Sequence, residues 1–207
     1  MKQQVVYIYG GESYLNHDDF LERLRTKPVW ELPWEPKKGK WSAALPEELG
    51  SDYEVFMPVM PNKQNAKYEE WKIWFERHFE YLRDGAILVG CSLGAMFLYK
   101  YLIENTLPFK ARAAILMAAP LPDLLPEDER DSGDFVYPSE SVHQINETVE
   151  SIIIMHSQDD FVVPYKHAVA YQELLPEAEF VSFEDKNHFL VPELPELIEK
   201  IREMSGK

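Results

Sequence analysis

The sequence AILVGCSLGAMFLYKYL, residues 86–102, contains the local pattern that decides the fold. It begins with an apolar run typical of a buried strand and ends with a longer apolar run typical of a buried helix. Between the two runs lies a Gly-x-Ser-x-Gly pattern formed by Gly90, Ser92 and Gly94. Glycines at both ends of such a turn let strand and helix approach closely, and the serine is held in a strained conformation with its hydroxyl exposed. The stretch therefore predicts a nucleophilic serine at the end of a strand.

Strand-like and helix-like runs alternate through the rest of the chain. The predicted strands are residues 5–9, 53–59, 86–90, 113–120, 151–157 and 179–185. The predicted helices are residues 65–83, 94–103, 165–175 and 195–204. This alternation predicts an α/β protein of three layers, with a mostly parallel central sheet of about six strands and helices on both faces. We expect little or no lid over it.

The length of 207 residues fits a single domain, residues 1–207, and two segments fall outside the alternation. Residues 25–51 form a Trp/Pro-rich inserted segment that contains Trp30, Trp34 and Trp41. Residues 121–150 form an acidic, variable segment. Segments of this length inside a compact domain often cover a functional site, so both are candidate walls of a pocket.

Composition narrows the class of protein. The formal net charge of −15 argues against nucleic acid, whose phosphates such a surface would repel. No apolar run reaches the ~20 residues that cross a bilayer, so no membrane association is expected. The single cysteine, Cys91, fits a reducing compartment, and no secretory leader is recognisable, which together predict a cytoplasmic protein. A protein partner is possible but not indicated.

A nucleophilic serine needs a base, and in strand-turn-helix hydrolases the chain order is Ser, then Asp or Glu, then His. His17, His78 and His143 precede every suitable acid at a strand end, and His156 precedes the aspartates of its own loop. His167 lies inside a predicted helix. His188 follows the last strand in a loop, and it alone meets both the order and the setting.

Asp159 and Asp160 both lie in the loop after the strand at residues 151–157, at the edge where open α/β proteins assemble their sites. Either can orient the imidazole, and spacing does not separate adjacent residues. Asp185 is a third option, although its closeness to His188 favours a role in shaping the turn.

The oxyanion of a tetrahedral intermediate also needs hydrogen-bond donors. One should be the backbone N–H of Leu93, which follows the serine at the positive end of a helix. The other should come from the loop after the first strand, Gly10-Gly11-Glu12, with Gly11 or Glu12 as the donor and Gly10 allowing the sharp exit.

With these residues assigned, the chain resembles an α/β-hydrolase, and more narrowly the small serine hydrolases of the retinoblastoma-binding-protein type. The motifs that carry the resemblance are MPN at residues 60–62 followed by Trp71, ERDSGDF at 129–135, SQDDFVVPY at 157–165 and NHF at 187–189. The resemblance implies that Asp160 is the acid. It covers most of the chain from about Glu54 onward.

Three departures from that family pattern stand out. Cys91 replaces a histidine found before the serine in many relatives, and we expect it to pack in the sheet. Asn187 replaces a glycine before the histidine, so that loop is expected to differ. The segment at residues 25–51 is longer than its counterpart, which bears on specificity.

These residues predict a carboxylesterase-like serine hydrolase (class EC 3.1.1) that cleaves a small ester or amide through an acyl-enzyme. Ser92, His188 and Asp160 would act together, with no cofactor and no metal. The main alternative is a binding or regulatory protein that keeps the fold with weak catalysis. An acyltransferase with the same three residues is a further alternative.

Overall fold

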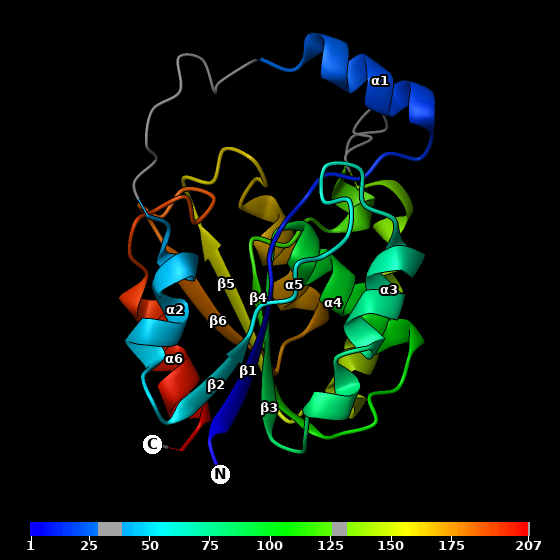
Figure 1. Ribbon diagram of the computed structural model, residues 1–207. Helices are drawn as coiled ribbons and strands as arrows, with labels where there is room; N and C mark the ends of the chain where they lie inside the picture. The colour runs from blue at the N-terminus through cyan, green and yellow to red at the C-terminus, as the bar shows by residue number, and fades with distance from the viewer. Residues whose placement is uncertain (29–38, 126–131, 207) are drawn as a thin grey trace.

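The computed structural model describes residues 1–28, 39–125 and 132–206, and Figure 1 shows one central sheet with helices on both sides. The strands are β1 (Gln3–Ile8), β2 (Tyr53–Phe56), β3 (Ala86–Cys91), β4 (Ala111–Met117), β5 (Ile152–Ser157) and β6 (Glu179–Phe183). They form one sheet in the order β2-β1-β3-β4-β5-β6, and every pairing is parallel. The predicted α/β architecture with about six strands is confirmed.

The helices divide between the two faces of the sheet. They are α1 (His17–Thr26), α2 (Trp41–Leu49), α3 (Tyr68–Glu76), α4 (Leu93–Glu104), α5 (Lys166–Leu174) and α6 (Pro195–Met204). Helices α2 and α6 cover one face, while α3, α4 and α5 cover the other (Figure 1). Because strand side chains alternate, Val6 and Ile8 join the core under α4 whereas Val5 and Tyr7 join the core under α2.

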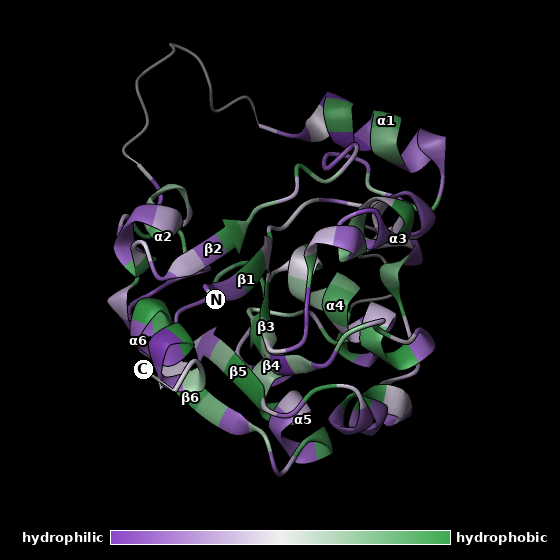
Figure 2. Ribbon diagram, turned by 60° about the horizontal axis from the view of Figure 1, so that its bottom comes forward, coloured by the Kyte–Doolittle hydropathy of each residue, from purple (hydrophilic) through white to green (hydrophobic). Residues whose placement is uncertain are grey.

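The buried strands and α4 are apolar nearly all round, as the sequence predicts. Every residue of β3 is buried, and so are nine of the twelve residues of α4. Figure 2 shows hydrophobic colour along the central strands and mixed colours on the outer helices. A helix and strand so fully enclosed hold the turn between them rigidly, and Ser92 lies in that turn.

The described part of residues 25–51 contains an ordinary crossover helix. Helix α2 connects β1 to β2 and buries Trp41, Leu45 and Leu49, spaced four residues apart, against the sheet and α6. Trp30 and Trp34 lie outside the described residues. Helix α1 buries none of its residues and lies beyond the carboxyl ends of the strands (Figure 1).

The variable segment at residues 121–150 forms short 3-10 helices where it is described: η2 (Pro122–Leu124), η3 (Gly133–Phe135) and η4 (Ser139–Glu147). Phe135, Val142 and Ile145 are fully buried in the core beside α4. This segment therefore contributes to the core, although its composition is mostly polar.

The helix predicted at residues 65–83 is shorter in the structure. Helix α3 ends at Glu76, and a separate 3-10 helix, η1 (Phe79–Tyr81), follows. The apolar spacing continues past the end of α3 because Phe79 still packs edge-on against Phe75 and Tyr101 of the core. The apolar periodicity thus predicted the buried face correctly but did not predict the change from α-helix to 3-10 helix.

Candidate active site

Ser92 lies between the last residue of β3 and the first residue of α4. Its backbone has φ 56° and ψ −127°, a conformation that non-glycine residues rarely adopt. The Ser92 N–H donates to the Met117 carbonyl at 2.9 Å, and the Ser92 carbonyl accepts from Ala95 N at 2.9 Å. The strained turn is therefore fixed by hydrogen bonds on both sides.

The glycines of the motif are needed for close approach. A Cβ atom on Gly94 would lie 2.2 Å from the Ile8 carbonyl oxygen, and one on Gly90 would lie 2.7 Å from the Ala95 Cα. A Cβ on Gly10 would lie 2.9 Å from the Ser92 Cβ. The absence of these three side chains lets α4, β1 and the loop after β1 meet around Ser92.

The sheet brings that loop to Ser92 because β1 has β2 on one side and β3 on the other. From β1 the chain continues to β2 on one side, and then crosses to β3 on the other side of β1. The carboxyl ends of the strands at such a switch point border a natural ligand site. Gly10 and Ser92 follow the two strands that meet there. The position of Ser92 thus agrees with the general location of sites in open α/β sheets.

Backbone N–H groups at this edge differ in whether they are already used. Among the described residues, neither Leu93 N–H nor Gly11 N–H has a backbone acceptor. Leu93 is the first residue of α4, whose initial N–H groups have no partner within the helix. Glu12, the alternative donor from the sequence, donates its N–H to Lys63 O at 2.8 Å. Glu12 N–H is therefore engaged away from Ser92, which leaves Gly11 as the better candidate.

Asp160 and His188 are joined across 28 residues of sequence. His188 Nδ1 lies 2.8 Å from Asp160 Oδ2, and the side chain of Asp160 is fully buried. Asp160 Oδ1 accepts from the backbone N–H groups of Val162 and Val163, each at 2.8 Å. The loop after β5 thus wraps around the carboxylate and directs its other oxygen toward His188.

These contacts set the charge of Asp160. Burial raises the pKa of the Asp160 carboxyl, but hydrogen bonds from His156 and His188 outweigh burial and hold that pKa well below its usual value. The ionised carboxylate can only accept, so His188 Nδ1 donates to it, and in a neutral imidazole this tautomer has its lone pair on Nε2. In the structure, no hydrogen bond joins His188 Nε2 to the Ser92 hydroxyl. Such bonds are often long before a substrate binds.

Asp159 contacts the backbone of the histidine loop and not the imidazole. Its Oδ1 accepts from Asn187 N at 2.8 Å and from the Ser157 hydroxyl. Ser157 Oγ in turn accepts from Lys186 N at 3.0 Å. The adjacent aspartates therefore have different partners: Asp160 binds the ring of His188, whereas Asp159 ties down the loop that carries it. Asp185 is an exposed residue of that loop.

The backbone conformation of Asn187 explains how this position can depart from the glycine of the family pattern. Its φ is 49°, in the left-handed region that glycine adopts freely and that asparagine tolerates better than most residues. Phe189, on the other side of His188, also has a left-handed φ of 52°. The loop therefore keeps a backbone shape suited to glycine, although the glycine itself is replaced.

Two other histidines are buried with hydrogen-bond partners, and the cysteine is buried as well. His156 Nε2 donates to Val163 O at 2.8 Å and lies 3.4 Å from Asp160 Oδ2. His167 Nδ1 accepts from Leu121 N at 2.9 Å, and burial, with the charge of Lys166, lowers the pKa of His167 to about 4. Burial raises the pKa of the Cys91 thiol to about 12, so Cys91 packs as a protonated thiol, as predicted.

Some features of the site were not visible in the sequence. The contact of His156 with Asp160 could not be predicted, because strand spacing alone does not show where a side chain from β5 meets the following loop. Within the described ranges, no group of three or more His, Cys, Asp or Glu side chains is arranged to hold a metal ion. In the same residues, no helix is long and apolar enough to pass through a bilayer.

Comparison with known proteins places these observations in a family. A family model described as serine hydrolase matches residues 32–196. Serine hydrolase RBBP9 of Rattus norvegicus is 30% identical over 145 residues, which cover 70% of this chain and 74% of that protein.

Solved structures share the fold over the whole chain. The ydeN gene product of B. subtilis is 18% identical, with a TM-score of 0.73 and full coverage of both chains. An alpha/beta fold family hydrolase from Bacillus anthracis str. Sterne is 14% identical, with a TM-score of 0.59 over 99% of this chain and 92% of the other. The chain has the α/β-hydrolase fold and belongs to the serine hydrolase family.

Proposed function

We propose that this protein is a carboxylesterase-like hydrolase that cleaves a small carboxylic ester, or an amide, through an acyl-enzyme on Ser92. The observation that carries the proposal is the buried 2.8 Å bond between Asp160 and His188, formed at the same sheet edge as the strained turn of Ser92. A buried carboxylate that orients an imidazole is the arrangement that makes a serine hydroxyl reactive.

The first half of the reaction forms the acyl-enzyme. Ser92 Oγ attacks the carbonyl carbon of the ester while His188 Nε2 takes the hydroxyl proton. Asp160 stabilises the resulting imidazolium through Nδ1. The N–H groups of Leu93 and Gly11 donate to the oxyanion. The intermediate then collapses, the bond to the leaving oxygen breaks, and His188 gives its proton to that oxygen.

The second half returns the enzyme to its starting state. A water molecule gives its proton to His188 Nε2 as its oxygen attacks the acyl carbon. The second tetrahedral intermediate releases the carboxylic acid, and the proton returns to Ser92 Oγ. Each proton that His188 takes is given up again, so the proposed cycle leaves the protein unchanged. A cytoplasmic location remains a prediction.

The surroundings of Asp160 and His188 favour a neutral substrate with an apolar group. Phe161 and Val162 follow Asp160 directly and are 70% and 50% exposed, and Leu190, two residues after His188, is 56% exposed. Single exposed apolar residues are common, but three beside one carboxylate–imidazole pair are informative. Because the net charge is −15, an anionic substrate would be repelled.

A fluorophosphonate probe tests the proposal, because it reacts covalently with activated serines. Intact-mass spectrometry should show one probe on the wild-type protein and none on Ser92→Ala. Cys91→Ala is the matched control, since it removes the neighbouring thiol, and it should still be labelled. Wild-type protein that resists the probe at every pH between 6 and 9 would contradict the proposal and favour the binding-protein alternative.

A further inference from the structure

The loop that carries His188 has a conformation that needs support. Asn187 and Phe189, on either side of His188, both have left-handed φ values. A bulky aromatic residue rarely adopts this region, and it persists only where surrounding contacts fix it. The position of the His188 ring therefore depends on the groups that hold residues 187 and 189.

Asp159 holds the first of these residues, and Trp41 holds the second. Asn187 N donates to Asp159 Oδ1 at 2.8 Å. The Trp41 indole N–H donates to the Phe189 carbonyl at 2.9 Å, and this buried bond spans 148 residues of sequence. The Phe189 ring is itself buried, edge-on to Phe183. The loop is thus held on both sides of His188.

Trp41 is a rigid anchor for this bond. It is the first residue of α2, is 7% exposed, and packs against Tyr7 of β1 with ring centroids 5.2 Å apart. Figure 1 shows α2 beside α6 and below the loop that follows β6. The indole therefore transmits the fixed position of the core to the histidine loop.

We propose that Trp41 is a positioning residue for His188: its N–H keeps Phe189 in the left-handed conformation that aims the imidazole at Asp160 and Ser92. This rests on the proposed function and gives a role to the described end of the Trp-rich segment. Without the N–H, the buried Phe189 carbonyl would lack its donor. The peptide would then turn toward a more common φ and carry His188 with it.

The test removes the indole N–H while keeping an aromatic ring. Trp41→Phe should lower kcat for a p-nitrophenyl ester about tenfold or more, with KM changed by less than about twofold, because a misplaced base affects the reaction more than binding. If that variant folds poorly, 3-benzothienylalanine at position 41 replaces the N–H by sulfur with little change of shape. Circular dichroism and denaturant unfolding establish the folded fraction.

Trp71→Phe is the matched control. The Trp71 indole N–H also donates to a backbone carbonyl, that of Pro61 at 2.8 Å, and Trp71 is fully buried. The control loses the same kind of bond, so a general effect of reduced stability would appear in both variants. Only the Trp41 variants should disturb the histidine loop.

A proton NMR readout makes the test independent of catalysis. The Nδ1–H of His188, bonded to a buried carboxylate, should give a low-field resonance that disappears in His188→Gln. Loss or broadening of this resonance in folded Trp41 variants, but not in Trp71→Phe, supports the proposal. An unchanged resonance with kcat within about twofold of wild type overturns it. A wild-type protein with the resonance but no hydrolysis would contradict only the proposed function.

Discussion

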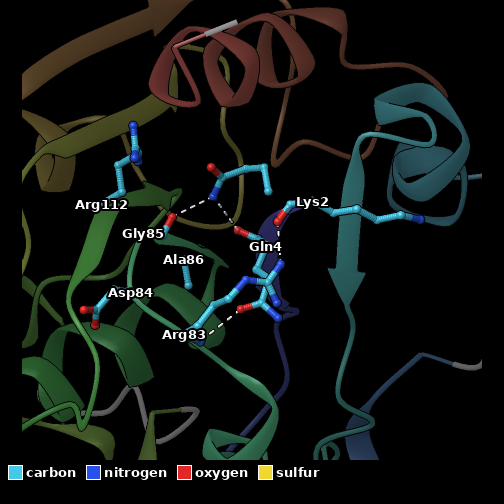
Figure 3. A pocket seen from close by; sticks show the side chains of 8 residues that line it. Lys2, Gln4, Arg83, Asp84, Gly85, Ala86 and Arg112 are labelled. Carbon is cyan, nitrogen blue, oxygen red and sulfur yellow. Dashed lines mark hydrogen bonds between the residues drawn. The ribbon is translucent and has the colours of Figure 1, made fainter.

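The two ends of strands β1 and β3 use their polar groups in opposite ways. At the amino ends, the buried Gln4 side chain donates to Glu54 and to Tyr81 O and accepts from Arg83 N, at 2.8–3.0 Å. Figure 3 shows this region, in which the Lys2 side chain extends away from the other residues. At the carboxyl ends, the His188 Nε2 and the Ser92 hydroxyl are not bonded to each other, and Leu93 N–H has no backbone acceptor among the described residues.

This difference separates polar groups that stabilise the fold from those that are proposed to react. Buried polar groups that satisfy one another stabilise the fold, whereas groups left available at a strained turn can act on a ligand. At the amino end the Gln4 side chain is therefore fully paired, whereas backbone and side-chain groups at the carboxyl end remain available. Substitutions at the two ends should separate stability from activity.

The largest effect is expected from Ser92→Gly. Removing the proposed nucleophile should lower kcat/KM at least about ten-thousandfold. Glycine adopts φ 56° without strain, so the free energy of unfolding should rise by about 1 kcal/mol. Ester hydrolysis and urea unfolding measure the two quantities. A variant that is less stable than wild type would show that the turn stores no strain.

The next largest effect is expected on stability, when a glycine at either end of the sheet is replaced by alanine. Gly94→Ala would place a methyl group 2.2 Å from the Ile8 carbonyl oxygen and should cost about 3 kcal/mol of stability, because α4 and β1 must separate. Gly85, at the amino end, has φ 88°, and the atom nearest to an added Cβ would be a guanidinium nitrogen of Arg112 at 3.7 Å. Gly85→Ala should therefore cost only about 1 kcal/mol, through backbone strain.

Gly39→Ala is the reference for this pair, because nothing lies within 4 Å of the added Cβ. Its unfolding free energy should stay within about 0.5 kcal/mol of wild type. Equal losses for Gly94→Ala and Gly85→Ala in denaturant titrations would argue against close packing at the carboxyl end.

A substitution at Gln4 tests the paired polar groups of the amino end directly. Gln4→Met keeps the length of the side chain but leaves Tyr81 O and Arg83 N without their partner, and should cost about 2 kcal/mol. Because the amino end takes no part in the proposed reaction, kcat measured on folded protein should match wild type. A large fall in kcat would mean that the two ends are coupled through β1.

The smallest effect is a dependence of folding stability on pH, caused by a buried histidine near the carboxyl end of the sheet. The pKa of buried His167 is about 4, below the ordinary 6.5 of an unfolded histidine. The unfolded chain therefore binds a proton that the folded protein does not between pH 6.5 and 4, and stability falls as pH decreases through this window. His167→Gln should reduce that fall by about 1 kcal/mol in urea unfolding compared at pH 7 and pH 5.5. Parallel pH curves for both proteins would contradict the assignment.

The sequence was sufficient where the structure depends on local patterns. The strand, turn and helix around Ser92 are contiguous, and glycine spacing alone indicates that close packing is required there. The order of Ser92, Asp160 and His188 along the chain indicated which side chains reach one edge of a parallel sheet. At Asn187 the expectation of a different loop overlooked a local signal, because asparagine tolerates the left-handed backbone that glycine adopts.

Contacts between distant segments could not be predicted in the same way. The bond from Trp41 to Phe189 depends on how α2 packs against the sheet, which no local pattern encodes. The hydrogen bond of Glu12 N–H to Lys63 similarly arises from two loops that meet only in the folded protein. Sequence reasoning therefore predicts the candidate reacting side chains more readily than the groups that orient them.

The assembly of the site from β3, β5 and β6 has a consequence for the newly made chain. During synthesis, Ser92 leaves the ribosome almost a hundred residues before His188, and the last strand must pair before the imidazole can reach its carboxylate. A nascent chain thus carries the alcohol without its activating base. Under the proposed chemistry, unfinished chains are inert toward cellular esters, and hydrolysis begins only after the final strand has paired.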